Sequence, residues 1–147
     1  MLAIVNEMKM EFPSRSANEA LARSAAAQMA ASLDPTLDEL SDIKTAVSEA
    51  VTNAVVHAYP VRLGTVWLRA RILEGNILEV VVRDKGVGID DVDNARRPMV
   101  TTGGDERSGM GFTIMENFMD SVKVRSAPGR GTAVTMRKRV ETRSPRA

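Results

Sequence analysis

The spacing of apolar and polar residues alternates along the chain between a period of two and a period of about 3.6, which indicate strands and helices respectively. Residues 8–12 alternate polar and apolar side chains, so we predict a half-buried strand that ends at Pro13. Stripes of apolar residues with helical spacing follow over residues 16–32 and 36–57. Each predicted helix begins with the spacing of a capping box; the two pairs are Ser16 with Glu19 and Thr36 with Glu39.

The second half of the chain predicts a hairpin, a long loop, a third helix and two last strands. Residues 65–73 and 77–83 are rich in Val, Leu and Ile and flank Glu74-Gly75-Asn76, which favours a tight turn. Residues 84–108 have no period, and a loop of this length in a small domain is typical of a functional segment such as a lid. The last elements are a helix over 109–119 and strands over 122–126 and 132–137.

This order of elements predicts an α+β fold, a two-layer α/β sandwich in which helices cover one face of a mostly antiparallel sheet. A chain of 147 residues suits one hydrophobic core. We therefore expect a single domain over residues 1–138, followed by a polar, basic tail over residues 139–147.

Composition narrows the possible partners and chemistry. The 20 Lys and Arg residues nearly balance 19 Asp and Glu residues, so no global basic field attracts nucleic acid or an anionic membrane, and we expect neither as a direct partner. With no Cys and a single His, the chain has no thiolate nucleophile and no multi-histidine metal cluster. We recognise no signal peptide or transmembrane stretch and expect a cytoplasmic protein.

A first group of candidate residues follows one stripe of the second predicted helix, where Glu49, Asn53 and His57 are spaced four apart. Such a stripe is often a solvated helix face and nothing more. The alternative is a site at the edge of a cleft. There Asn53 would offer a carbonyl oxygen to a hard cation, and Glu49 would offer a carboxylate for general-base work.

A second group is Asp84 with Gly86 and Gly88, directly after a predicted strand. Two glycines at this spacing predict a turn. A carboxylate next to two residues without a Cβ also suits a ligand that the backbone approaches closely and whose exocyclic amine donates to the acid. No Gly-Lys-Ser or Gly-Lys-Thr occurs in the chain, so this is not a P-loop.

A third group stands at the start of the third predicted helix, in Arg107-Ser108-Gly109-Met110-Gly111. Free N–H groups at a helix N-terminus, a flexible glycine pair and a nearby Arg together suit phosphate oxygens. A plain helix start with an exposed Arg fits the same pattern.

Taken in chain order, the three groups and a final Gly131-Thr132 resemble the N-box, the two glycine boxes and the Gly-Thr of the GHKL ATPase/kinase superfamily. The longer runs over residues 47–54 and 107–120 resemble the anti-sigma factors of that superfamily that are serine kinases, and in particular those of sporulation. The resemblance covers most of the chain. It implies a Bergerat-type ATP-binding fold and a homodimer.

By that resemblance, the protein would bind ATP and Mg²⁺, hold a sporulation sigma factor inactive, and phosphorylate and so inactivate an anti-anti-sigma protein on a serine. Asn53 would ligate Mg²⁺, Glu49 would be the catalytic base, and Asp84 would accept from the adenine amino group. The other nucleotide-binding positions that it implies are Gly86 and Gly88, which would give room, Thr132 beside the adenine contact, and Thr102, Arg107, Ser108, Gly109, Met110 and Gly111 around the phosphates.

One departure from the family lies in the predicted lid. Related lids often carry a Lys just after a Thr-Thr pair, but Thr101-Thr102 is followed here by Gly103-Gly104-Asp105. A lysine contact to phosphate from that position is therefore missing. Arg107 would carry more of the interaction with the phosphates.

Other functions fit parts of the pattern. A non-catalytic module that binds sigma in a nucleotide-dependent way would have no use for Glu49, and a general-stress anti-sigma serine kinase fits the same motifs. A histidine kinase would have to act wholly in trans, because the single His57 lies inside the N-box helix. Glu19 and Arg23, four residues apart on the first helix, are either an exposed ion pair worth about 0.3–0.5 kcal/mol or a contact to an acidic surface of a protein partner.

Overall fold

The computed structural model describes residues 1–89, 92 and 106–141, and of residues 106–110 the backbone alone. Five strands form one sheet in the order β1-β2-β3-β5-β4, and every neighbouring pair is antiparallel. The strands are β1 (Ile4–Pro13), β2 (Thr65–Leu73), β3 (Ile77–Asp84), β4 (Ser121–Ala127) and β5 (Gly131–Arg139). All five predicted strands are present, and β1 and β5 are longer than their sequence patterns indicate.

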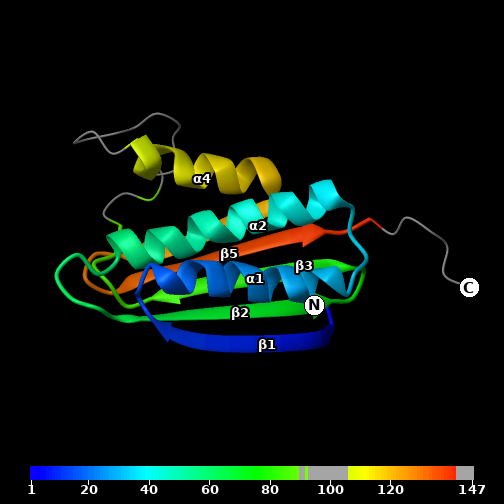
Figure 1. Cartoon of the computed structure of the whole chain (residues 1–147), viewed down its shortest axis with the longest axis horizontal. Helices are drawn as coiled ribbons and strands as arrows, with labels where there is room; N and C mark the ends of the chain where they lie inside the picture. The colour runs from blue at the N-terminus through cyan, green and yellow to red at the C-terminus, as the bar shows by residue number, and fades with distance from the viewer. Residues whose placement is uncertain (90–91, 93–105, 142–147) are drawn as a thin grey trace, which may run out of the picture.

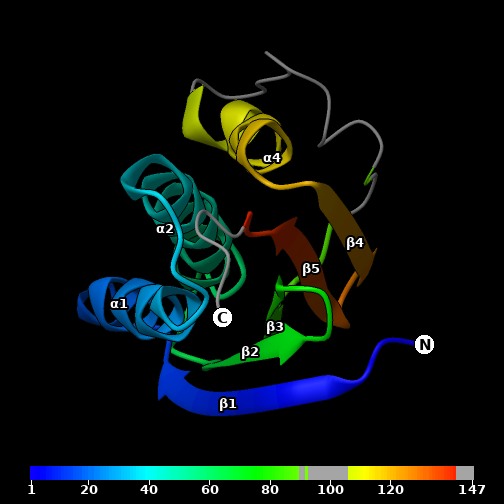
Figure 2. The ribbon, with the colours of Figure 1, turned by 90° about the vertical axis from the view of Figure 1, so that its right-hand side faces the viewer.

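The helices α1 (Ala17–Ala31), α2 (Leu37–Thr52) and α4 (Glu106–Phe118) all cover the same face of the sheet (Figure 1). A π-helical turn, η1 (Asn53–His57), continues α2 directly. The view along the strands shows the helices in one layer and the strands in the other (Figure 2). This arrangement confirms the predicted two-layer α+β sandwich. Within the described part of the chain, no helix combines the length and the apolar character needed to cross a membrane.

The hydrophobic core fills the space between the two layers, with α2 at its centre. Alternate residues of β2 are buried under the helices, as the period of two predicts. Fully buried side chains meet here from both layers; they include Ile43, Val47 and Val51 of α2 and Leu68, Val80 and Met136 of the sheet. Burial of each such side chain contributes about 1.5–3 kcal/mol. The buried side of α2 thereby fixes which way its polar stripe faces.

One of the two predicted capping boxes is present. Thr36 and Glu39 exchange side-chain and backbone hydrogen bonds of 2.8 Å at the start of α2. The corresponding prediction for α1 is wrong, because Ser16 has helical backbone angles and its side chain makes no capping bond. The carboxylate of Glu19 turns away from Ser16 and accepts a hydrogen bond from Ser48 of α2.

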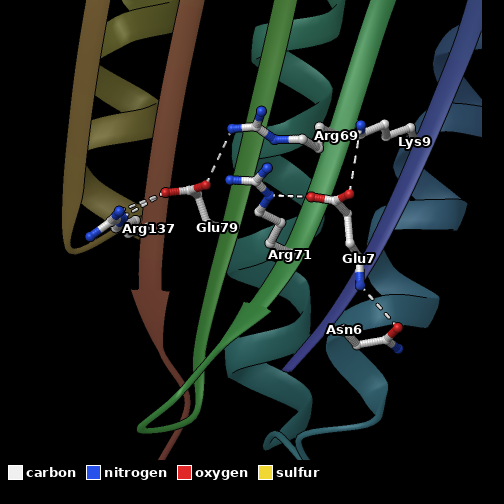
Figure 3. Close-up of polar contacts among 7 residues, drawn as sticks. All are labelled: Asn6, Glu7, Lys9, Arg69, Arg71, Glu79 and Arg137. Atoms are coloured by element: carbon white, nitrogen blue, oxygen red, sulfur yellow. Dashed lines mark hydrogen bonds and ion pairs between the residues drawn. The ribbon is translucent and has the colours of Figure 1, made fainter. Parts of the chain in front are cut away.

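The face of the sheet without helices carries charged residues in cross-strand pairs (Figure 3). Glu79 of β3 is only 5% exposed and lies between Arg69 of β2, at 3.6 Å, and Arg137 of β5, at 2.8 Å. Glu7 of β1 pairs with Arg71 of β2. A buried carboxylate without partners would cost several kcal/mol, so the two flanking guanidinium groups are what allows Glu79 to stand here.

Candidate functional site

A cavity of about 320 Å³ opens where η1 meets the ends of β3 and β5. Its size lies at the lower end of the range for small-molecule sites, about 300–1,000 Å³. Apolar side chains of Ala, Val, Ile and Phe form most of its lining. Four of the predicted site residues line it, and so does His57; the four are Asn53, Asp84, Gly88 and Thr132.

Asp84 is the buried acid of this cavity. It is the last residue of β3, faces Thr132 across the β3–β5 pair and is 7% exposed. Its Oδ1 accepts the N–H of Gly86 at 2.9 Å. Burial raises the pKa of Asp84, while hydrogen bonds from the backbone of Gly86 and Thr132 oppose that rise. A carboxylate has more acceptor positions than these bonds use, so Asp84 can also accept from an amino group in the cavity.

The hydroxyl of Thr132 belongs to a small network that sequence analysis missed. Thr132 Oγ1 lies 2.9 Å from Ser126 Oγ of β4. Ser126 also donates to the carbonyl of Gly131 at 2.9 Å and accepts the N–H of Ile89 at 2.8 Å. It thereby ties the chain after Gly88 to β4 and β5. A serine at the end of a strand carries no distinctive pattern, so no signal in the sequence singles out Ser126.

The polar stripe of α2 and the second glycine pair lie side by side. A Cβ placed on Gly111 of α4 would lie 3.4 Å from Oε2 of Glu49 and 3.4 Å from Nδ2 of Asn53. Gly111 of α4 therefore packs against the polar stripe of α2, at a distance that leaves room for no more than a Cβ. Asn53 lines the cavity, whereas Glu49, one helical turn before it, does not.

Helix α4 begins at Glu106, before the predicted start at Gly109. The first three residues of a helix have N–H groups without a partner within it, so that of Ser108 is available to a ligand. From Gly109 on, each N–H group has a carbonyl acceptor in the preceding turn, and the contacts of Gly109, Met110 and Gly111 to phosphate stay predictions. The side chains of residues 106–110, including that of Arg107, lie outside the described part of the chain, and so do Thr102 and the rest of residues 90–91 and 93–105 of the predicted lid.

The two glycines after Asp84 are required by contacts within the protein. A Cβ on Gly86 would lie 2.1 Å from the carbonyl oxygen of Ala58, directly after η1. The space left by Gly86 is therefore occupied by Ala58 and not by a ligand. Gly88 lines the cavity, and a Cβ on it would lie 2.1 Å from the carbonyl oxygen of Ala127.

Gly88→Ala is expected to destabilise the fold more than Gly129→Ala. Both glycines have a left-handed backbone, with φ of +77° and +74°, which costs an L-residue about 1–2 kcal/mol. A Cβ on Gly129 meets nothing within 4 Å, whereas one on Gly88 clashes with the backbone of Ala127. Overpacking of this kind adds about 1–3 kcal/mol. Urea denaturation of both variants measures the difference, and equal losses would contradict the close approach.

Glu19 and Arg23 of α1 form an ion pair of 3.3 Å, and Glu19 is also bonded to Ser48. The Arg23 side chain is 38% exposed, so part of its guanidinium group faces solvent. The ion pair expected from the sequence is therefore present, but it is partly buried, because the Glu19 side chain is only 19% exposed. Ser48 precedes Glu49, which connects this surface of α1 to the polar stripe of α2.

The donor set fits a Mg²⁺ ion held together with phosphate groups. Within residues 1–89, 92 and 106–141, no cluster of three or more acidic, His or Cys side chains could hold a metal by itself. Mg²⁺ usually keeps several waters and takes one or two protein oxygens besides the phosphates of a substrate. The amide oxygen of Asn53, at the cavity wall one turn from a carboxylate, suits that role.

Comparison with known proteins identifies the class to which this fold and cavity belong. Residues 12–138 match the family described as the histidine kinase-like ATPase domain, and the chain therefore belongs to this family of GHKL ATPases and kinases. Its relatives include the anti-sigma F factor of Oceanobacillus iheyensis, which is 52% identical over 136 residues, 92% of this chain and 93% of that protein. The anti-sigma F factor of Pasteuria penetrans is 54% identical over 138 residues, 92% of each chain. Within the ATPase family, the chain thus belongs with the anti-sigma F factors.

Solved structures show the same fold. The RsbU and RsbW domains of a Mycobacterium tuberculosis protein align with a TM-score of 0.68 and 18% identity, over 92% of this chain and 32% of that one. A histidine kinase domain of a blue-light activated kinase from Erythrobacter litoralis aligns with a TM-score of 0.56 and 28% identity, over 70% of this chain and 45% of that one. The predicted fold class and the resemblance to GHKL proteins are both confirmed.

Proposed function

We propose that this protein is an anti-sigma factor and a protein serine kinase. It holds a sporulation sigma factor inactive, and it uses MgATP to phosphorylate and so inactivate an anti-anti-sigma partner. The names of its relatives support the first activity. The observation that carries the second is the position of buried Asp84 in a cavity whose wall also includes Asn53, one turn from Glu49.

In this proposal, the cavity binds the adenine ring. Asp84 accepts a hydrogen bond from the exocyclic amino group, because its carboxylate is held at the wall by Gly86 and Thr132. Thr132 supports the contact through its own hydroxyl network with Ser126. The apolar lining, which includes Phe112, covers the purine and excludes water.

The triphosphate then extends from the cavity toward α4. Asn53 ligates Mg²⁺, and the N–H group of Ser108 at the start of α4 binds a phosphate oxygen. Arg107 and Thr102 are further proposed phosphate contacts. When bound, Mg²⁺ neutralises charge on the phosphate oxygens.

Glu49 acts as the general base for transfer. The serine hydroxyl of the partner gives its proton to the Glu49 carboxylate as its oxygen forms a bond to the γ-phosphorus, the bond from that phosphorus to the β,γ-bridging oxygen breaks, and ADP leaves. Glu49 lies against Gly111, where no side chain separates it from the start of α4. This contact with α4 supports the proposed role of Glu49.

Incubation of the purified protein with labelled ATP, Mg²⁺ and the anti-anti-sigma protein of the same organism tests the kinase proposal directly. We expect label on a serine of the partner, located by mass spectrometry. Absence of transfer from a preparation that still binds ATP and sigma factor would favour the non-catalytic module. We also propose that the protein is cytoplasmic and forms a homodimer. Light scattering of the purified protein tests the dimer, for which it should give twice the mass of one chain.

Arg23→Glu is expected to weaken binding of an acidic partner surface by at least tenfold. The exposed guanidinium group of Arg23 suits a carboxylate of the sigma factor or of the anti-anti-sigma protein, and like charges placed together at an interface cost several kcal/mol. Lys44→Glu, at an exposed position of α2, makes the same charge change elsewhere. The test is the affinity of each variant for the sigma factor and for the anti-anti-sigma protein. If Arg23→Glu binds both as tightly as the wild type, Arg23 does not contact either partner.

A further inference from the structure

The segment that follows η1 is bonded to the loop that follows Asp84. Three successive N–H groups of that loop have defined acceptors. The N–H of Lys85 donates to Tyr59 Oη at 2.7 Å, that of Gly86 to Asp84 Oδ1 at 2.9 Å, and that of Val87 to the carbonyl of Ala58 at 2.9 Å. Two residues outside the loop therefore hold the backbone on both sides of the N–H that binds the Asp84 carboxylate.

Tyr59 is itself firmly held. Its hydroxyl accepts from Lys85 and donates to the carbonyl of Thr65, at the start of β2, over 2.6 Å. A Cβ on Gly64 would lie 2.1 Å from the Tyr59 ring, so the ring packs against bare backbone. With its donor and its acceptor both in use and its ring confined, the Tyr59 hydroxyl is a fixed anchor point.

The loop needs such an anchor because of its composition. Gly86 and Gly88 both lack a Cβ, so the backbone after Asp84 has more freedom than that of other residues. The hydrogen bond from Gly86 orients the Asp84 carboxylate only if the backbone of the loop is itself fixed in position. Lys85 is exposed, so water can replace Tyr59 as acceptor of its N–H, and loss of the hydroxyl would loosen the loop without unfolding the protein.

We propose that Tyr59 is a positioning residue that sets the preference of the cavity for adenine, by holding the loop that orients the Asp84 carboxylate. Tyr59 does not line the cavity and acts through Lys85 and Gly86. The inference rests on the proposed contact between Asp84 and the adenine amino group. It adds to that proposal a residue that no sequence pattern singled out.

Binding of ATP and of inosine triphosphate separates this role from a merely structural one. Inosine triphosphate carries a carbonyl where ATP carries the amino group, so it has no donor for Asp84 at that position. Calorimetry on the full chain should show that Tyr59→Phe weakens ATP binding about three- to tenfold, the range for one hydrogen bond, and changes binding of inosine triphosphate little. The preference for ATP should shrink by the same factor.

Ser14→Ala is the matched control. Ser14 Oγ accepts the N–H of Gly64 at 2.9 Å, so its loss loosens the chain beside Tyr59 without touching Lys85. We expect an unchanged preference for ATP in this variant.

Three outcomes would overturn the inference. If the Tyr59→Phe variant loses affinity for both nucleotides by the same factor, or for neither, Tyr59 does not act through Asp84. An equal loss of preference in Ser14→Ala denies that the bond to Lys85 is responsible. A wild-type protein that binds ATP and inosine triphosphate equally would refute the adenine contact of Asp84 itself, and so separates failure of the proposed site from failure of the role of Tyr59.

Discussion

Glu49→Gln is expected to lower the rate of phosphoryl transfer to the anti-anti-sigma protein by about 10²–10⁴-fold, the range for loss of a general base. The amide has the size of the carboxylate and keeps the packing against Gly111, but it does not take up the serine proton. Single-turnover transfer at saturating ATP measures the chemical step. Affinity for ATP should change little, because Glu49 does not line the cavity.

Glu39→Gln provides the matched control on the same helix. Glu39 is in the capping box of α2, and Gln at this position supports the same pair of hydrogen bonds. We expect normal transfer from this variant and a small loss of stability, because Oε2 of Glu39 also accepts the N–H of Glu141 and the NH₂ group of Gln does not. If Glu49→Gln transferred phosphate at nearly the wild-type rate, the assignment of the base would fail even though the nucleotide site stood.

Local sequence signals predicted those parts of the fold that local interactions determine. The hairpin of β2 and β3 turns at Gly75 and Asn76, which both have a left-handed backbone as the turn chemistry requires. The capping box at Thr36 needs contacts over three residues only. The failure at Ser16 has the opposite cause, because Glu19 is drawn to Ser48 of another helix, a contact between elements that no spacing along the chain reveals.

The candidate site divides in the same way. A helical stripe made Glu49 and Asn53 visible in the sequence, and the position of Asp84 at a strand end did the same for the acid. Their convergence depends on how α2, α4 and β3 pack, and it was available beforehand only through resemblance to a family. Ser126 and Tyr59 were missed because a single hydroxyl gains its role from partners in distant segments.

Asp84→Asn is expected to weaken ATP binding by about 1–3 kcal/mol, or about 5- to 150-fold, because it removes a buried anionic acceptor. An amide is less suitable, since its NH₂ group can face the adenine amino group, donor against donor. Calorimetry with ATP measures the loss. Inosine triphosphate is the internal control, because its carbonyl can accept from the NH₂ group of Asn, so it should bind the variant at least as tightly as the wild type.

The same variant should not lose stability, which separates a binding residue from a structural one. Burial raises the pKa of Asp84, so the folded state holds this proton more tightly than the unfolded chain does. The stability that follows from the raised pKa is fully present below the unfolded pKa of about 3.9 and is lost as pH rises through the folded pKa. At pH 7 the wild type therefore bears the cost of a buried charge that the neutral amide of the variant avoids.

We expect the free energy of unfolding of Asp84→Asn at pH 7 to equal or exceed that of the wild type, and its advantage to shrink as pH falls toward the unfolded pKa. A variant that loses ATP binding and stability together would instead assign Asp84 to the fold.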